Sequence, residues 1–265
     1  IDITDKDAMF AFFEAHRDAT GIVHLAAQAG VRYSLKNPFA YISSNVYGHT
    51  VVMEGARKLP QLRHVVYASS SSVYGTNAKL PFSVADRVDA PSSLYAATKR
   101  SDELISHTYA HLYRIPLTGL RFFTVYGPWG RPDMAAYIFA KKIVAGEPIQ
   151  VFNQGEMWRD FTFIDDIVAG VLSALAKPPT GPVPHRIFNL GNNRSERLLD
   201  YIGEIEKALG RKAVYELLPM QPGDVPRTYA DIESSRRELG YDPKTSIAEG
   251  VPRFIAWFKD YHKIG

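Results

Sequence analysis

Cysteine is absent from this 265-residue sequence, and its absence excludes disulfide bonds and metal sites built on thiolate ligands. A chain without cysteine is compatible with a reducing compartment, so we expect a cytoplasmic protein. Long apolar runs are missing as well. None reaches the roughly 18 residues that a membrane-spanning helix requires, and we therefore expect no membrane partner.

A strong net charge is also missing. The 31 basic and 28 acidic residues leave a formal net charge of +3, which is too small to indicate nucleic acid or an anionic membrane as the main partner. A few arginines remain available for an anionic small molecule. We expect a ligand of that kind and no bound metal.

The sequence does contain apolar, strand-like segments that alternate with amphipathic, helix-like segments. This alternation predicts an α/β fold with a doubly wound parallel sheet that helices cover on both faces. The expected strands are 21–27, 64–70, 116–123, 148–152, 186–190 and 214–218. The expected helices are 7–16, 37–58, 94–113, 134–145, 165–176, 198–209, 232–239 and 247–261.

Tyr95 and Lys99 stand four residues apart at the start of an expected helix, a spacing that places both side chains on one helix face. A free tyrosine hydroxyl has a pKa of about 10, too high for a base at neutral pH. A neighbouring ammonium group favours the phenolate, so such a pair could move a proton to or from a sugar hydroxyl. With 15 tyrosines in the chain, the spacing also arises by chance, and both interpretations stay open at this point.

Serines stand at the carboxyl end of the expected strand 64–70, where ligands bind to parallel sheets. Ser70, Ser71 and Ser72 could donate hydrogen bonds to a substrate oxygen. They could equally form a polar loop in which hydroxyls cap the next helical turn.

Several segments together carry a resemblance to a known family. Ala68–Gly75, Tyr95–Lys99, Leu120–Pro128 and Arg159–Asp166 resemble the extended short-chain dehydrogenase/reductase family, which includes the NAD-dependent epimerases and dehydratases. Within that family, His24–Ser34, Ser93–Lys99 and Gly127–Asp133 are similar to UDP-glucuronate 4-epimerases. The resemblance runs through nearly the whole chain and is densest from Leu25 to Ile167.

The resemblance implies a Rossmann-like NAD-binding domain over residues 1–123, to which residues 159–191 return. It implies a smaller C-terminal α/β substrate domain of residues 124–158 and 192–265. NAD is then the cofactor and a UDP-sugar the substrate. The helices over residues 37–58 and 93–113 resemble the family's dimer-forming pair, so we expect a homodimer.

The resemblance also implies residue roles. Tyr95 is the acid and base at the sugar 4-hydroxyl, Lys99 binds the nicotinamide ribose, and Ser70 occupies the catalytic Ser/Thr position. The implied cofactor contacts are Tyr95, Lys99, Asp2, Ile3, Leu25, Ala26, Ala27, Gln28, Asn45, Ala68, Ser69, Phe122 and Val125. The implied substrate contacts are Val31, Arg32, Ser70, Ser71, Ser72, Thr124, Arg131, Val151, Phe152, Arg159 and Asp224, the last in Pro222–Asp224. Arg186 and Arg227 are weaker candidates, which surface salt bridges explain equally well.

The residues after Ser70 narrow the expected reaction to the C4 epimerisation of UDP-glucuronate to UDP-galacturonate. Related dehydratases carry an acidic pair there, and UDP-glucuronate decarboxylases carry a glutamate. Here Ser71 and Ser72 could hold a carboxylate by neutral hydrogen bonds, whereas an acid would repel it. Thr124 leaves room for that carboxylate, and Arg131 either contacts it or only orders its own loop. UDP-galactose 4-epimerase and UDP-glucuronate decarboxylase remain the alternatives.

One part of the family pattern is not found. Family members carry a glycine-rich turn after their first strand, and its backbone amides bind the pyrophosphate. No such turn precedes Asp2 or follows a later strand, so we expect this sequence to lack the family's first β–α–β segment. If the protein itself begins here, we expect weak NAD binding and an exposed sheet edge, and a non-catalytic protein becomes the further alternative.

Overall fold

The computed structural model describes residues 1–221 and 224–264. Pro222 and Gly223, from the predicted substrate segment Pro222–Asp224, lie outside the described residues. The chain divides into two compact units. The first unit comprises Ile1–Phe122, Gly170–Leu190 and Ile232–Tyr241, and the second comprises Phe123–Ala169, Gly191–Asp231 and the segment from Asp242 onward.

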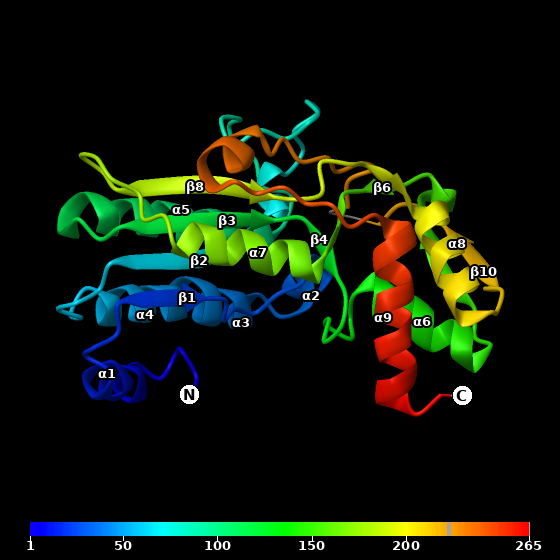
Figure 1. Ribbon diagram of the computed structural model, residues 1–265, viewed down its shortest axis with the longest axis horizontal. Coiled ribbons are helices and arrows are strands. Elements are labelled where there is room, and N and C mark those ends of the chain that lie inside the picture. The colour runs from blue at the N-terminus through cyan, green and yellow to red at the C-terminus, as the bar shows by residue number, and fades with distance from the viewer. Residues whose placement is uncertain (222–223, 265) are drawn as a thin grey trace. The chain divides into compact units, whose positions relative to one another are not determined.

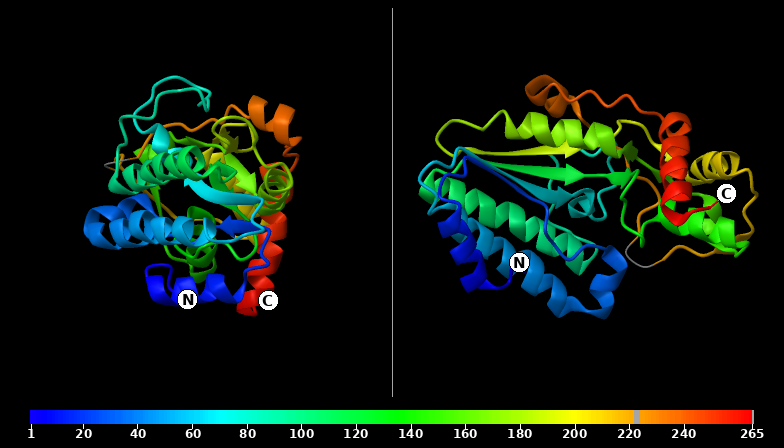
Figure 2. Two further views of the ribbon diagram at one scale, coloured as in Figure 1. Left: turned by 90° about the vertical axis from the view of Figure 1, so that its left-hand side faces the viewer. Right: turned by 60° about the horizontal axis from the view of Figure 1, so that its bottom comes forward.

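A four-stranded parallel sheet with the order β1, β2, β3, β8 forms the centre of the first unit. These strands are β1 (Gly21–His24), β2 (His64–Ser70), β3 (Leu117–Phe122) and β8 (His185–Leu190). Figures 1 and 2 show α4 (Gly48–Ala56) and α5 (Leu94–Tyr113) on one face of the sheet and α7 (Ile164–Leu175) on the other. Helices on both faces of a parallel sheet confirm the predicted Rossmann-like α/β class.

Helix α1 (Lys6–Ala15) packs against α4, and the sequence accounts for both its start and its position. Asp5 caps the helix by accepting a hydrogen bond from the Ala8 amide, the usual role of an N-cap aspartate. Met9 and Phe13 are buried on one face. Gly55 permits the close approach, because a Cβ atom there would stand 2.0 Å from the Phe13 ring.

The predicted helix over residues 37–58 is a series of shorter pieces. It consists of α3 (Pro38–Tyr41), a π-helical stretch (Ile42–Tyr47) and α4, and it is preceded by α2 (Val31–Lys36), which the sequence did not predict. Gly30 precedes α2 with a φ of 104°, a conformation that glycine adopts without strain. π-Helical turns often occur at functional sites, and this one carries Asn45.

The second unit is a smaller α/β body. Its elements are β4 (Thr124–Tyr126), α6 (Ala135–Ala145), β5 (Ile149–Phe152), β6 (Trp158–Arg159), β7 (Phe161–Phe163), β9 (Glu196–Arg197), α8 (Leu198–Leu209), β10 (Tyr215–Leu218) and α9 (Ile247–His262). Its core includes Phe161 and Tyr201, whose rings stack with centroids 3.9 Å apart. β5 pairs with β10 and β4 pairs with β7, each in parallel.

The division of the chain differs from the expected domains at two places. Residues 159–169 belong to the second unit, because β6 pairs with β9 and β7 pairs with β4. Residues 232–241 belong to the first unit, where the Ser235 hydroxyl donates to the backbone oxygen of Asn189 at 2.7 Å. These pairings join distant segments, so hydrophobic periodicity along the chain does not show them.

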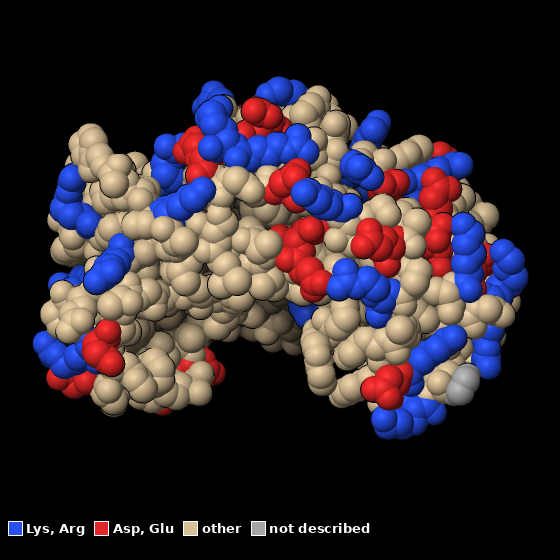
Figure 3. Space-filling model, viewed as in Figure 1, with Lys and Arg blue, Asp and Glu red and all other residues tan. Residues whose placement is uncertain are grey.

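The surface carries charges of both signs. On the face shown in Figure 3, lysine and arginine side chains alternate with aspartate and glutamate side chains. No helix within residues 1–221 and 224–264 combines the length and the apolar character needed to cross a membrane. The same residues contain no group of three or more histidine and acidic side chains that could hold a metal ion.

Candidate active site

Helix α5 carries Tyr95 and Lys99, and a cap determines where the helix begins. The Ser93 hydroxyl accepts a hydrogen bond from the Ala96 amide at 3.1 Å, so Tyr95 falls in the first turn. Its ring is half-buried and meets the Tyr41 ring edge-on, with centroids 6.1 Å apart. The fully buried Tyr41 donates its hydroxyl to the backbone oxygens of Ala29 and Gly30, which orders the loop that follows β1.

Lys99 is buried and forms an ion pair that the sequence reasoning missed. Its Nζ lies 2.9 Å from Oδ2 of Asp102, three residues further along α5. Residues three apart share a helix face, so the spacing was available as a signal. The pair places a carboxylate beside the Lys99 ammonium group. By the resemblance, that ammonium group binds the nicotinamide ribose and acts on Tyr95.

Asn45 joins the loop after β1 to helix α5. Its Oδ1 accepts the Gln28 amide at 2.8 Å, and its Nδ2 donates to the Gln28 oxygen at 3.0 Å and to the Thr98 hydroxyl at 2.9 Å. Both amide protons are therefore used within the protein. Asn45, predicted as a cofactor neighbour, shapes the site by holding the Gln28 backbone.

The serine turn after β2 lies against α5. Ser70 ends β2 and caps the short helical turn Ser71–Tyr74, accepting the Ser72 amide at 3.2 Å and donating to the Ser72 hydroxyl at 3.1 Å. This turn and α2, which carries Val31 and Arg32, both pack against α5. The structure thus brings the predicted serines to the helix that carries Tyr95. It also shows Ser70 capping the next helical turn, which was the alternative interpretation.

Ser69 and Phe122 complete the strand ends of the first unit. Ser70 and Phe122 are register partners across β2 and β3. The Ser69 hydroxyl donates to Glu103 at 2.7 Å, and Glu103 forms a two-point ion pair with the buried Arg121. The Ser69 hydroxyl is thus engaged within the protein, and the predicted cofactor contacts of Ser69 and Ala68 stay predictions.

Burial keeps two histidines near the site neutral. His24, the last residue of β1, has its pKa lowered to about 4 by burial and by the Lys99 charge. The pKa of His49 on α4 is lowered well below its usual value, again mainly by burial. Their rings stack at 5.3 Å. Neither side chain adds positive charge beside Lys99 near neutral pH.

Three of the predicted cofactor contacts line a groove of about 410 Å³ along β1. Ile3, Leu25 and Ala26 contribute to it, and Leu25 is 54% exposed at the end of the strand. A largely apolar groove of this size is typical of cofactor sites. Ala27 and Gln28 follow directly and are partly exposed. These residues fit the cofactor the family implies.

The Asp2 carboxylate forms hydrogen bonds within a local turn. Oδ1 accepts both the amide and the hydroxyl of Thr4 at 2.9 Å, and these hydrogen bonds lower the pKa of Asp2. The side chain is exposed and ionised at neutral pH. Its predicted cofactor contact stays a prediction.

The other predicted substrate contacts lie in the second unit. Arg131 forms a two-point ion pair with Asp133, the loop-ordering contact that was the alternative for this residue. Arg159 donates to the backbone oxygen of Trp158 at 2.9 Å. The amide of Thr124 donates to the backbone oxygen of Asp160. Val151 is fully buried in the core, and its predicted substrate contact stays a prediction. Phe152 and Asp224 are partly buried, as is Val125, which was predicted as a cofactor contact.

The two weaker arginine candidates have protein partners. Arg186 pairs with Glu238, and Arg227 donates through Nε to the Ser195 hydroxyl at 3.0 Å. For Arg186 the salt bridge expected as the alternative is present. These contacts agree with structural roles for both side chains.

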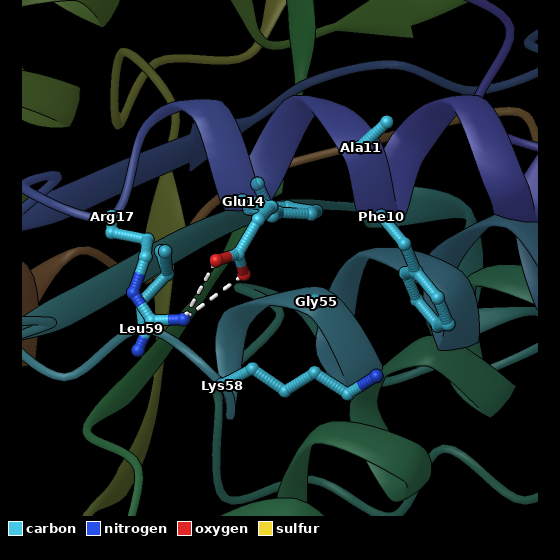
Figure 4. A pocket seen from close by; sticks show the side chains of 8 residues that line it. Phe10, Ala11, Glu14, Arg17, Gly55, Lys58 and Leu59 are labelled. Atoms are coloured by element: carbon cyan, nitrogen blue, oxygen red, sulfur yellow. Dashed lines mark hydrogen bonds and ion pairs between the residues drawn. The ribbon is translucent and has the colours of Figure 1, made fainter.

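A second pocket, of about 310 Å³, lies between α1 and the end of α4 (Figure 4). Phe10 and Phe13 line it, Lys58 lies over the Phe10 ring, and Glu14 pairs with Arg17 at its rim. None of its lining residues belongs to the predicted site, so the geometry gives it no part in the chemistry.

Comparison with known proteins places this geometry in a family. Residues 1–191 match the NAD dependent epimerase/dehydratase family. An uncharacterized protein of Methanocaldococcus jannaschii is 57% identical over 237 residues, which are 89% of this chain and 71% of that protein. A probable UDP-glucuronate 4-epimerase of Rhizobium meliloti is 46% identical over 257 residues, 91% of this chain and 75% of that protein.

A solved structure agrees with these sequence matches. The crystal structure of UDP-glucuronic acid 4-epimerase from Bacillus cereus, in complex with UDP-glucuronic acid and NAD, is 32% identical to this chain with a TM-score of 0.86. The match covers 98% of this chain and 81% of that one.

Proposed function

The chain belongs to the NAD dependent epimerase/dehydratase family, and from that premise we propose that it epimerises UDP-glucuronate at C4, giving UDP-galacturonate. The observation that carries the proposal is the hydroxyl turn Ser70–Ser72 against the helix of Tyr95 and Lys99. The relatives that are UDP-glucuronate 4-epimerases support the same substrate.

Tyr95 handles the proton of the sugar 4-hydroxyl in this proposal. Its phenol oxygen accepts that proton as C4 is oxidised and returns it after the opposite face of the 4-keto sugar has been reduced. Lys99 and Tyr95 share one face of α5, so the ammonium charge favours the phenolate form. Ser70 would turn its hydroxyl proton from the Ser72 oxygen to the sugar oxygen and so orient the sugar.

When bound, NAD would accept a hydride from C4 and return it to the same carbon, so that the reaction as a whole involves no net oxidation. Ile3, Leu25 and Ala26 would hold the cofactor in the groove along β1, and Lys99 would bind its ribose. The backbone around Gln28, fixed by Asn45, would border the nicotinamide end.

The hydroxyls of Ser71 and Ser72 are the reason why we propose a substrate that carries a carboxylate. A 4-keto uronate is a β-keto acid and can lose carbon dioxide. Neutral donors at Ser71 and Ser72 hold the carboxylate in place without adding the negative charge that an acidic residue would bring. Both residues belong to the turn that Ser70 caps, so their positions relative to the strand end are determined by β2.

Incubation of the protein with UDP-glucuronate, with and without added NAD, tests the proposal directly. We expect UDP-galacturonate, separated chromatographically, and no UDP-pentose. A UDP-pentose product would identify a decarboxylase. Turnover of UDP-galactose without turnover of UDP-glucuronate would identify the other epimerase. No product with any of these substrates, even with added NAD, would contradict an enzymatic role.

A matched pair of variants tests the carboxylate contact. Ser71→Ala should lower epimerisation of UDP-glucuronate and raise the share of decarboxylated product. Thr180→Val removes an exposed hydroxyl in the loop between α7 and β8 and should change neither quantity. An unchanged rate and product ratio in Ser71→Ala would remove the carboxylate assignment.

A homodimer through α3, α4 and α5 is part of the proposal. Phe39 on α3 is 82% exposed, and Leu104 and Leu112 on α5 are more than half exposed. Exposed apolar side chains on neighbouring helices are typical of protein interfaces. Light scattering of the purified protein should give twice the chain mass, and a monomer at all concentrations would contradict the dimer.

The cellular location is the last part of the proposal. A chain without cysteine suits a reducing compartment, and we place the enzyme in the cytoplasm. Fractionation of the source cells should recover it with cytoplasmic markers, and recovery with another compartment would contradict this placement.

A further inference from the structure

Asp102 lies on the same stripe of α5 as the two residues assigned to the chemistry. Tyr95, Lys99 and Asp102 are spaced by four and three residues, which aligns them along one helix face. The Lys99 ammonium reaches Oδ2 of Asp102 at 2.9 Å, and the two side chains are only 5% and 1% exposed. The ion pair is therefore enclosed by protein.

Stability alone is a poor explanation for this pair. Removing two charges from water is costly, and the attraction between them rarely exceeds that cost unless every remaining polar atom is hydrogen-bonded. Here Oδ1 of Asp102 is buried without a hydrogen-bond partner among the described residues. Burial raises the pKa of Asp102 to about 6, although Lys99 acts in the opposite direction. The carboxylate is thus ionised near neutral pH at a cost.

The described groups around the pair offer Lys99 no other counter-charge. His24 from β1 and His49 from α4 are neutral near pH 7, as described above. Tyr67 from β2 has its pKa raised well above the usual value by burial, so it is neutral too. Glu103, the next acid on α5, is engaged by Arg121, Arg100 and Ser69. Asp102 is the carboxylate that faces the ammonium.

We propose that Asp102 is a positioning residue for the reaction: it keeps the enclosed Lys99 amine charged and directed along the face of α5 that carries Tyr95. An amine enclosed by protein without a counter-charge favours its neutral form. A neutral amine neither stabilises a phenolate nor binds a ribose oxygen as strongly as an ammonium group does. This assignment rests on the proposed function, and it adds a residue that acts through Lys99.

Direct titration of Lys99 tests the assignment without any turnover. The full-length protein is labelled at lysine side chains with ¹³C and ¹⁵N, and the ε-methylene and amine signals are followed by NMR between neutral and alkaline pH. Lys99→Met identifies the signal. In Asp102→Asn, Lys99 should lose its proton at a pH lower by at least about one unit than in the unsubstituted protein.

Three further variants keep the test decisive. Asp260→Asn breaks the exposed pair with Lys263, which has the same three-residue spacing, and should leave the Lys99 titration unchanged. Asp102→Glu retains the charge and should shift the midpoint less than Asp102→Asn. Asp102→Ser also removes the charge, and it decides the matter if the asparagine variant does not fold. An unchanged midpoint in the folded variants that lack the charge would overturn the assignment.

Kinetics with UDP-glucuronate and NAD give the second measurement. We expect Asp102→Asn to lower kcat at neutral pH by about tenfold or more while KM changes less, with partial recovery in Asp102→Glu. A variant that is only less stable would keep its kcat and its pH profile once folded, and that result would overturn the assignment. Absence of turnover by the unsubstituted protein would refute the proposed function, while the Lys99 titration would still decide the role of Asp102.

Discussion

Two buried aspartates, one in each unit, have the same raised pKa in opposite surroundings. Burial raises the pKa of both Asp102 and Asp160 to about 6. Asp160, fully buried in the second unit, accepts hydrogen bonds from the amides of Asn192 and Ala230 and from the Thr162 hydroxyl. Asp102 has an ammonium partner on one oxygen, and no described residue forms a hydrogen bond with the other.

The difference distinguishes a carboxylate that stabilises the fold, Asp160, from one that acts as the counter-ion of a neighbouring ammonium group, Asp102. Asp160 joins β7 to segments around positions 192 and 230, and its two oxygens are satisfied by backbone and hydroxyl donors. The Asp102 carboxylate has no hydrogen-bond or ion-pair partner beyond its own helix among the described residues. A buried polar group whose capacity is fully used stabilises a structure, whereas one with unused capacity needs another explanation.

The largest expected effect is on catalysis in the first unit. Tyr95→Phe should lower kcat by about 10² to 10⁴, the usual contribution of a general acid and base, while the free energy of unfolding changes by less than about 1 kcal/mol. Steady-state rates and urea unfolding measure the two quantities. A variant that retains most of its kcat would contradict the role of Tyr95.

The next effect is on stability in the second unit. Asp160→Ala leaves at least two buried amides, those of Asn192 and Ala230, without an acceptor. At about 1 to 3 kcal/mol for each lost partner, the free energy of unfolding should fall by roughly 3 kcal/mol. Thermal and urea unfolding would measure it. A loss below about 1 kcal/mol would place Asp160 with Asp102 and break the comparison.

The pH dependence of stability distinguishes the histidine beside the Lys99 pair from the aspartates. The pKa of His24 is about 4 in the folded protein and 6.5 in the free side chain. As pH falls from 6.5 to 4, His24 binds a proton in the unfolded chain but not in the folded chain. The free energy of unfolding therefore decreases over that range. The loss amounts to about 3 kcal/mol.

His24→Gln removes that titrating group. The variant should therefore lose less stability than the unsubstituted protein between pH 6.5 and 4, as measured by urea unfolding at each pH. The two aspartates act in the opposite direction, because their raised pKa values favour the folded state as pH falls. Parallel pH curves for the two proteins would show that His24 is protonated in the folded state.

The smallest effect is expected at the surface of the second unit. The Arg131–Asp133 pair is about half exposed, so Arg131→Ala should change the free energy of unfolding by less than about 1 kcal/mol. If Arg131 also contacts the substrate carboxylate, KM for UDP-glucuronate should rise. An unchanged KM would leave the arginine with only its loop-ordering role.

Local signals in the sequence account for much of the first unit. The strand 64–70 and the helix 94–113 have in the structure the bounds that their apolar patterns predict. The strand expected over 21–27 ends earlier, at His24, because the residues after it form the loop held by Asn45. The two- and three-residue strands β4, β6, β7 and β9 are too short for any periodicity to show.

The candidate site likewise contains features that the sequence indicates and features that it does not. The motif with Tyr95 and Lys99 is visible as a spacing, and the resemblance supplied the serines and the cofactor contacts. The Asp160 cluster depends on residues 32 and 70 positions away, which no spacing along the chain indicates. Asp102 is close in sequence to Lys99, yet its burial, which makes it informative, depends on the packing of α5 against β2, β3 and α4.

The hydrogen bonds of Asn45 have a consequence for a chain that has no cysteine. One amide side chain joins a loop 17 residues before it to a helix residue 53 positions after it. In effect it is a non-covalent cross-link that closes two loops at one point. Unlike a disulfide bond, it needs no oxidant to form and is unaffected by a reductant. Folding alone therefore sets the geometry of the loop that follows β1.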